Sequence, residues 1–242
     1  MSDLVLQAAG VSAGYVPDLP ILSDVSLSAR SGQITLIIGP NGAGKSTFIK
    51  AIAGLIPVSD GSITFDGKDI TGLPTEQLTT RGIAYVPQTD NIFRSLTIRQ
   101  NLNLALRRSA NAADTLTRLL DQFPALADKQ RDKAGTLSGG QRQFLAIAMA
   151  LASSPRLILM DEPSAGLSPK AAQEVLEHAR ALTEKGVSIL LVEQNVKQAL
   201  RLADHCFILA EGRNQVDGSA QDLLNDNVVG EIYLGGKRVG AA

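Results

Sequence analysis

Short apolar runs rich in β-branched residues recur along the chain and predict the strands of a central sheet. The run at 33–38 leads into a glycine-rich loop, so we expect it to be a buried parallel strand. Similar runs lie at 83–86, 156–160 and 187–192, and we expect 187–192 to be the last buried parallel strand. Residues 3–30 predict β structure with short strands at 4–7 and 25–28, and 62–65 predicts another strand before a hairpin turn at Asp66 and Gly67. These segments indicate an antiparallel layer beside the central sheet.

Between the strands, apolar positions recur at the spacing of amphipathic helices. The segment after the glycine-rich loop shows this spacing, and Gly54 can end that helix. Residues 97–123 are expected to be helical until Pro124 interrupts the pattern, and another helix opens at 138. Strands that alternate with helices indicate an α/β fold, with a helical part inserted before the sheet resumes at 156.

The last third of the chain continues this alternation. Ser168 and Pro169 predict the N-cap and first turn of a helix that closes at 185–186. His178 lies one step off the apolar stripe of this helix, so we expect it to be exposed. A hairpin at 211–213 and two short helices are expected at the end of the chain.

A phosphate-binding pattern follows the first buried strand. Residues 39–47 read Gly-Pro-Asn-Gly-Ala-Gly-Lys-Ser-Thr, the P-loop pattern, in the strand–loop–helix context that this pattern requires. Glycines let the backbone approach phosphate oxygens, Lys45 supplies a mobile charge, and Ser46 offers a hydroxyl to Mg²⁺. The predicted phosphate-binding residues are Gly39, Pro40, Asn41, Gly42, Ala43, Gly44, Lys45, Ser46 and Thr47. A glycine-rich turn with a surface lysine is the alternative, and the motifs below disfavour it.

Other polar clusters stand at the ends of predicted elements. Ser138 and two glycines, Gly139 and Gly140, place N–H groups and a hydroxyl at a helix N-terminus, which indicates a second anion site. Asp161 and Glu162 end a buried strand, where adjacent carboxylates are costly unless cations or chemistry require them. Asp161 suits Mg²⁺, and Glu162 suits the polarisation of a water molecule. In isolation these acids would be assigned to a surface loop, but a P-loop in the same chain favours a catalytic site.

Composition narrows the function classes. The chain has 242 residues, is 44% apolar and has a net charge of −1, so no overall field draws it to nucleic acid or anionic lipid. Basic spots at 107–108 and 129–133 are expected to be solvated helix faces. A single cysteine, Cys206, excludes an internal disulfide, is expected in the core and suits the cytosol. The N-terminus does not resemble a signal peptide, and no apolar run approaches the roughly 20 residues of a membrane span.

The order of these motifs resembles that of the ATP-binding-cassette (ABC) ATPases over nearly the whole chain. The P-loop, Gln88 at a strand end, Leu-Ser-Gly-Gly-Gln at 137–141 and Asp-Glu-Pro at 161–163 carry the resemblance. The Leu-Ser-Gly-Gly-Gln signature discriminates, because other P-loop NTPases lack it. The resemblance implies a mostly parallel central sheet, an antiparallel β subdomain and an inserted helical subdomain. It implies a catalytic core at 1–96 and 155–234, a helical signature subdomain at 97–154 and a flexible tail at 235–242.

In that family, two nucleotide-binding domains sandwich two ATP molecules between the P-loop of one and the signature of the other. The resemblance implies that Ser46, Gln88 and Asp161 serve Mg²⁺ and that Glu162 is the general base. It also implies that Ser138, Gly139, Gly140 and Gln141 cap the partner's ATP. Tyr15 would stack on adenine, although the residue alone is equally consistent with a partly buried tyrosine. Phe93 and Leu96 resemble a surface that docks a membrane subunit, and they are equally consistent with a core position.

Two positions depart from the commonest family pattern. The switch position is usually histidine and is Gln194 here, and Ser168 replaces a frequent aspartate. With these departures the chain looks most like an ATPase subunit of branched-chain amino acid importers, or of urea/amide importers. This implies a second ATPase subunit (a different chain or a copy), transmembrane permease subunits, an indirect solute-binding protein, no nucleic acid, and a peripheral place on the cytoplasmic face of the membrane.

The sequence disfavours two other functions. A soluble ABC ATPase of the translation or DNA-repair type usually has two cassettes, a coiled-coil insertion or a basic surface, none of which this chain shows. A regulatory nucleotide binder without turnover would lack the base, yet Glu162 is present. The solute, and the choice between homodimer and heterodimer, are not readable from the sequence.

Overall fold

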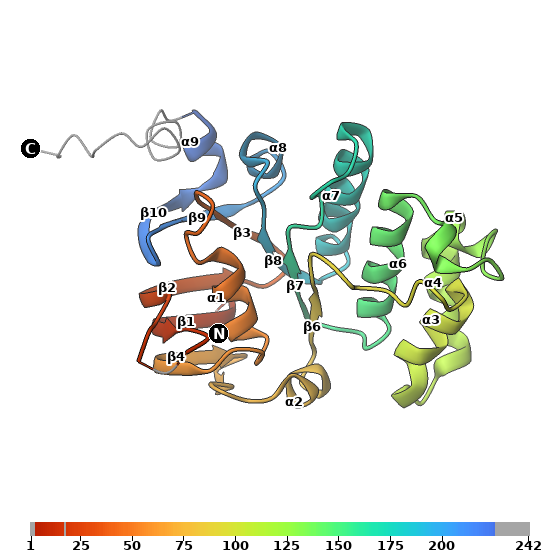
Figure 1. The fold of residues 1–242 in the computed structure, drawn as a ribbon, viewed down its shortest axis with the longest axis horizontal. Coiled ribbons are helices and arrows are strands. Elements are labelled where there is room, and N and C mark those ends of the chain that lie inside the picture. The colour runs from red at the N-terminus through yellow and green to blue at the C-terminus, as the bar shows by residue number, and fades with distance from the viewer. Residues whose placement is uncertain (1–2, 17, 226–242) are drawn as a thin grey trace, which may run out of the picture.

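The computed structural model describes residues 3–16 and 18–225, and a six-stranded sheet forms its centre (Figure 1). The strands are β3 (Ile34–Ile38), β6 (Ile83–Val86), β7 (Leu157–Asp161), β8 (Ser188–Val192), β9 (His205–Ala210) and β10 (Arg213–Ser219). Their order is β10-β9-β3-β8-β7-β6, and every neighbouring pair except β9–β10 is parallel. The predicted α/β class with a mostly parallel sheet is confirmed.

The prediction that 187–192 would be the last parallel strand was wrong. After β8, helix α8 (Val196–Leu200) leads the chain to the opposite side of β3, where β9 pairs in parallel and Leu36 faces Cys206. Helical crossovers of this kind are what parallel pairing requires. Cys206 is fully buried there, as predicted.

A second, antiparallel sheet precedes and flanks the P-loop strand. It comprises β1 (Leu4–Ala13), β2 (Leu22–Arg30), β4 (Val58–Phe65) and β5 (Lys68–Asp69) in the order β2-β1-β4-β5. The strands are longer than the predicted segments 4–7 and 25–28. Asp66 and Gly67 turn the chain between β4 and β5 with φ angles of 50° and 71°, so the predicted hairpin is confirmed.

Helices connect the strands and cover both faces of the central sheet. They are α1 (Lys45–Ile52), α2 (Thr75–Thr80), α3 (Ile98–Ala105), α4 (Ala112–Gln122), α5 (Pro124–Ala127), α6 (Gly139–Leu151), α7 (Pro169–Thr183), α8 and α9 (Ala220–Asn225). The segment 97–123 is not one helix, because the chain leaves helical geometry between a 3-10 turn at Leu106–Arg108 and α4. The second of the two helices expected at the end, and the predicted tail, lie outside the described residues.

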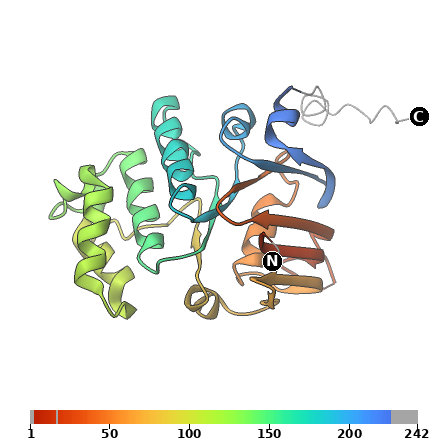
Figure 2. The same cartoon turned by 180° about the vertical axis from the view of Figure 1, so that it is seen from behind.

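The central sheet is buried on both faces, which explains its near-continuous apolar strands. Leu36 on one face of β3 belongs to a core shared with α3, α4, α6 and α7, whereas Ile37 on the other face packs with α1 and the antiparallel sheet. Figures 1 and 2 show α3 to α6 on the opposite side of the central sheet from β1, β2 and β4. The P-loop therefore starts α1 on one side, and the signature starts α6 on the other.

The prediction that His178 is exposed was wrong, because the residue is half-buried. Its ring packs on the rings of Phe123 and Phe144, with centroid distances of 4.6 Å and 5.5 Å. Its neighbours come from the α4–α5 junction and from α6, which cover α7 more widely than the stripe on α7 alone predicts. Burial, followed by the charge of Lys185, lowers the pKa of His178.

Candidate nucleotide-binding and catalytic site

The P-loop turns tightly between β3 and α1. Gly42 and Gly44 have φ angles of 81° and 94°, and a Cβ at Gly44 would lie 2.5 Å from Cδ2 of Leu22. Glycine is therefore required at residue 44 both by conformation and by space. The loop delivers the first N–H groups of α1, which a helix leaves without intrahelical partners, to one small region. This donor set fits the phosphates of a nucleotide.

Lys45 lies inside the loop that it follows. Its Nζ donates to the carbonyl oxygens of Gly39 at 2.8 Å and Pro40 at 3.1 Å, and the residue is 5% exposed. Burial lowers the pKa of Lys45, and the charges of Glu162 and Asp161 act in the opposite direction. The ammonium is thus already held next to the place where the loop can bind phosphate.

Asp161 and Ser46 meet at the carboxyl end of β7. The Ser46 hydroxyl donates to Oδ1 of Asp161 at 2.9 Å, and the Tyr85 hydroxyl lies 3.5 Å from Oδ2. Burial raises the pKa of Asp161, and hydrogen bonds from Ser46 and Tyr85 oppose that shift. A carboxylate and a hydroxyl side by side fit the hard oxygen ligands of Mg²⁺. Among the described residues no cluster of three or more histidine, cysteine or acidic side chains could hold a metal ion.

Glu162 is the point on which two strand-end glutamines converge. Gln88, two residues after β6, donates to Oε2 at 2.9 Å, and Gln194, two residues after β8, donates to Oε1 at 2.8 Å and to Oε2 at 2.7 Å. Glu162 is 6% exposed and has a φ of 49°, an uncommon backbone conformation outside glycine. In this arrangement Gln88 contacts the predicted base rather than Ser46 or Asp161.

A cavity of about 310 Å³ opens onto this carboxylate. The residues that line it are Gln88, Glu162, Ser164, Ala165, Gly166, Leu167, Pro169, Ala172, Glu193, Gln194 and Asn195. A space of this size holds several water molecules, so the carboxylate has access to water that it could polarise.

The signature is formed as a capped helix start. The Ser138 hydroxyl accepts from the N–H of Gln141, and the Gln141 side chain accepts from the N–H of Ser138. A Cβ at Gly139 would lie 2.7 Å from Cδ2 of Leu167, and one at Gly140 would lie 3.2 Å from Cβ of Ala171, so both glycines also serve packing. The structure does not bring this segment to the P-loop of the same chain, because α1 and α6 lie on opposite sides of β7 and β8 (Figure 1).

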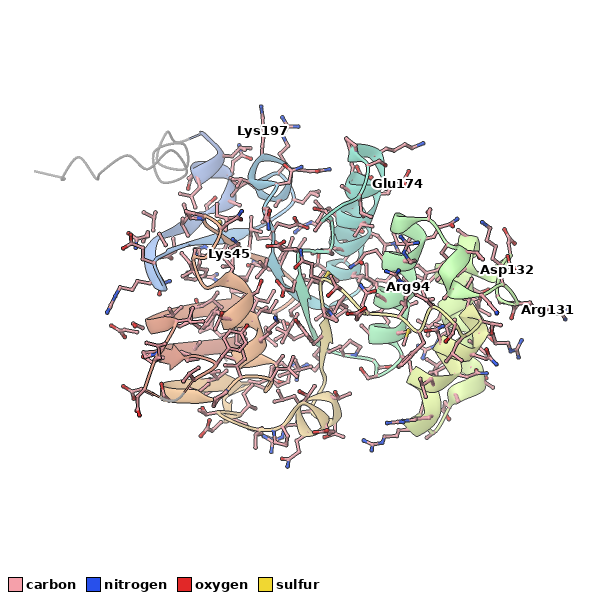
Figure 3. The ribbon with its side chains drawn as sticks, viewed as in Figure 1. Lys45, Arg94, Arg131, Asp132, Glu174 and Lys197 are labelled. Atoms are coloured by element: carbon pink, nitrogen blue, oxygen red, sulfur yellow. The ribbon has the colours of Figure 1, made fainter. Side chains whose placement is uncertain are left out.

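The remaining predicted residues lie on the surface. Tyr15 is 55% exposed beyond β1, and Phe93 is 52% exposed beyond β6, which excludes a core position for Phe93, while Leu96 is half-buried. The basic segment 129–133 is a turn at the outer end of the helical part, where Figure 3 shows Arg131 and Asp132 far from Lys45. No helix among the described residues is long and apolar enough to cross a bilayer.

Glu193 and Ser164 form a buried pair that the sequence did not reveal. Oε1 of Glu193 accepts from the N–H of Ser164 at 2.9 Å, and Oε2 accepts from the Ser164 hydroxyl at 2.8 Å. Burial raises the pKa of Glu193, which is 1% exposed. The sign of this pair in the sequence is an acidic residue, Glu193, that directly follows a buried strand and precedes Gln194. The contact between the Tyr85 hydroxyl and Asp161 was also not predicted. Its sign in the sequence is a hydroxyl group within an otherwise apolar strand.

The match to a family model decides the class of this site. Residues 22–165 match the family model described as "ABC transporter", which spans the P-loop, the signature and both acidic residues. The chain belongs to the ABC transporter family. It is therefore an ATP-binding, ATP-hydrolysing subunit, as the order of motifs predicts.

Curated relatives cover almost the full length of the chain. A probable branched-chain amino acid transport ATP-binding protein, LivF of Archaeoglobus fulgidus, is 41% identical over 96% of this chain and 99% of its own length. A high-affinity branched-chain amino acid transport ATP-binding protein, BraG of Pseudomonas aeruginosa, is 38% identical over 92% and 96%. The lipopolysaccharide export system ATP-binding protein LptB of Haemophilus influenzae is 35% identical over 96% and 97%.

Solved structures agree with this assignment. The ADP conformation of MJ1267, an ATP-binding cassette of an ABC transporter, gives a TM-score of 0.85 at 30% identity over 97% of this chain and 100% of that one. A dimeric post-hydrolysis state of the cassette MJ0796, bound to ADP and Pi, gives 0.77 at 26% identity over 89% and 98%. The family and the P-loop together show that this chain binds nucleotide.

Proposed function

We propose that the chain is an ATPase subunit of an importer for branched-chain amino acids or similar small solutes. Two of its relatives carry names of branched-chain amino acid transport proteins and are more similar to it than the export protein is. The chain works peripherally at the cytoplasmic face of the membrane. Its partners are a second ABC ATPase subunit, transmembrane permease subunits and, indirectly, a solute-binding protein.

The convergence of Gln88 and Gln194 on Glu162 carries the mechanistic proposal. Glu162 accepts a proton from a water molecule in the adjoining cavity. That water attacks the γ-phosphorus, and the bond from the γ-phosphorus to the bridging oxygen breaks, so that ADP leaves and inorganic phosphate is formed. Lys45 stabilises negative charge on the β- and γ-phosphates. Gln194 can donate to the γ-phosphate but cannot supply a positive charge there, because an amide does not become cationic. The amides of Gln88 and Gln194 hold the carboxylate in place until nucleotide draws them away.

Ser46, Asp161 and Gln88 would hold Mg²⁺ together with the phosphates. The ion would neutralise charge that develops on the transferred phosphoryl group. Tyr15, exposed beyond β1, stacks on the adenine base. The segments 1–96 and 155–234 act as the catalytic core, and 97–154 acts as the signature subdomain.

A dimer completes the site. Because the signature and the P-loop of one chain lie on opposite sides of the sheet, Ser138, Gly139 and Gly140 reach an ATP held by another cassette. The dimeric MJ0796 structure supports this arrangement. Phe93, exposed beside the helical part, docks a permease subunit.

Light scattering on the Glu162→Gln variant tests the dimer and the base together. This variant keeps the shape of the side chain, so we expect it to bind Mg-ATP and to hydrolyse it slower by about 10² or more. A mass that doubles with Mg-ATP would show that two copies complete both sites. A mass that stays monomeric while ATP binds would indicate a different ATPase partner. Near-normal turnover in the variant would show that Glu162 is not the general base.

Uptake measurements test the solute class. We expect deletion of the gene to reduce uptake of labelled leucine at low concentration, and re-expression of the chain, but not of Glu162→Gln, to restore it. Unchanged leucine uptake with a defective outer envelope would instead favour an export role like that of LptB. Unchanged uptake with an intact envelope would reject branched-chain amino acids as the solute.

A further inference from the structure

A cavity of about 270 Å³ lies between α4 and the two chain segments that lead into β7 and β8. Ser154 and Pro155 line it from the segment before β7, and Lys185 and Val187 line it from the segment before β8. Glu162, by contrast, directly follows the end of β7. The cavity and the predicted catalytic base thus stand at opposite ends of the same strand, so the cavity is separate from the nucleotide site.

Two cationic side chains line this cavity, and none of the described acidic residues does. Arg118 comes from α4, and Lys185 comes from the segment that follows α7. Neither side chain forms an ion pair with another described residue. Two uncompensated positive charges at one cavity favour an anionic ligand.

The wall formed by α4 also carries a donor without an acceptor. Thr115, Arg118 and Gln122 recur at helical spacing, so one face of α4 presents all three to the cavity. The Gln122 side chain forms no hydrogen bond with another described residue, and its Nε2 is buried. The Thr115 hydroxyl accepts from Nη2 of Arg118 at 3.2 Å, and it can still donate its own proton. A buried amide donor without an acceptor costs stability, so a ligand oxygen that accepts from Nε2 would recover that cost.

The rest of the lining is largely apolar. Leu119 on α4, Leu182 on α7 and Pro155 are buried side chains of this wall. An inorganic anion would leave that surface uncovered, whereas a short aliphatic group would cover it and gain the hydrophobic contribution. A free amino acid matches less well, because its ammonium group would lie near Arg118 and Lys185 without an acidic partner.

We propose that this cavity binds a small aliphatic monocarboxylate. The carboxylate lies between Lys185 and Arg118, whose planar fork can donate to both oxygens. A hydrogen-bond acceptor next to the carboxylate takes the free donor of Gln122, and the aliphatic body packs on the apolar wall. Such a ligand joins α4 to the segment before β8, so its binding stabilises the packing of the helical part on the central sheet. The proposal does not depend on which solute is transported.

Calorimetric titration with α-ketoisocaproate tests the site, because this probe has a carboxylate, an adjacent carbonyl oxygen and a branched aliphatic body. The full chain is titrated in saturating Mg-ADP, which occupies the P-loop. We expect saturable binding that weakens as salt rises. Gln122→Leu and Arg118→Gln should each raise Kd by about fivefold or more. The matched control is Arg108→Gln, because Arg108 is exposed on the same helical part but outside the cavity, and it should leave Kd unchanged.

The two histidines of the chain give a second measurement. Burial lowers the pKa of His178, and the charge of Lys185 lowers it further. A carboxylate bound beside Lys185 offsets that charge, so saturating probe should raise the pKa of His178 in an NMR titration. His205, which pairs with Asp217 on β10, is the internal control and should not shift.

Each outcome decides the proposal. It would be overturned by a lack of saturable binding up to about 10 mM probe, or by equal Kd values in wild type, Gln122→Leu and Arg118→Gln. An unchanged pKa of His178 at saturation would also overturn it, because the ligand would then lie elsewhere. Inorganic phosphate or leucine that binds as tightly as the probe would reject the monocarboxylate class. If either variant does not fold, Lys185→Gln removes the second cation from an exposed position and should weaken binding in the same way.

Discussion

The amide nitrogen of Gln194 lies 2.8 Å and 2.7 Å from the two carboxylate oxygens of Glu162. Gln88 adds a third hydrogen bond to the same carboxylate, at 2.9 Å. Three of the roughly four acceptor positions of this carboxylate are therefore used by neutral amide donors, and Oε1, which accepts a single hydrogen bond, keeps a position at which a water molecule can donate. The two amides fix the orientation of the carboxylate without neutralising its charge.

Replacement of Gln194 tests what an amide can do at this position. We expect Gln194→His to raise turnover at the affected site, and to raise it more below about pH 6.5, where an ordinary imidazole carries the charge that an amide lacks. Gln194→Ala should lower turnover, because the γ-phosphate loses a donor. The measurement is kcat against pH for the assembled ATPase. An unchanged profile in Gln194→His would show that this residue does not set the rate.

The contact between Ser46 and Asp161 leads to a prediction about Mg²⁺. Ser46→Ala removes the hydroxyl beside the carboxylate, so half-maximal ATPase activity should require about tenfold more Mg²⁺, roughly the loss of one ligand interaction. Tyr85→Phe is the matched control, because its hydroxyl touches the other oxygen of Asp161 at the longer distance of 3.5 Å. We expect only a small shift there, and equal shifts in the two variants would argue against metal ligation by Ser46.

The candidate site could be predicted from short local motifs. The pairing of segments that lie far apart in the sequence could not. The P-loop, Asp161 and Glu162 are short patterns that a strand–loop–helix context fixes, and Gln88 was correctly placed at the carboxyl edge of the sheet. The parallel pairing of β9 with β3 joins segments about 170 residues apart, a separation that local propensity cannot encode. His178 was misplaced for the same reason, because Phe123 and Phe144 reach it from other helices.

The buried pair of Glu193 and Ser164 leads to a prediction about stability. Glu193→Ala leaves the N–H and hydroxyl of Ser164 buried without their acceptor, which should cost about 1–3 kcal/mol of unfolding free energy. Glu193→Gln keeps an acceptor and should lose much less. Chemical denaturation at neutral pH distinguishes them, and equal losses in both variants would mean that the carboxylate charge, rather than its hydrogen bonds, holds the loop.

The pH dependence of Glu193 has a definite sign. Because burial raises its pKa, the folded state binds this proton more tightly than the unfolded state does. The resulting stabilisation is complete below the ordinary pKa of 4.5 and is lost as pH rises through the folded value. Wild type should therefore gain stability relative to Glu193→Gln on going from pH 7.5 to pH 5. A difference that does not change with pH would show that Glu193 titrates normally.

The packing of His178 between α7 and the helical part should make the stability of the protein decrease at acidic pH. Its pKa is lowered by burial, so the unfolded chain binds the proton near the ordinary value of 6.5 while the folded chain does not. The stability that the neutral ring contributes is present above 6.5 and is lost as pH falls towards the folded value. Between pH 7 and pH 5.5, the unfolding free energy of His178→Leu should change with pH less steeply than that of wild type, by the equivalent of up to one bound proton. At pH 8 the two slopes should be the same. Identical slopes for variant and wild type below pH 6.5 would contradict a neutral, half-buried His178.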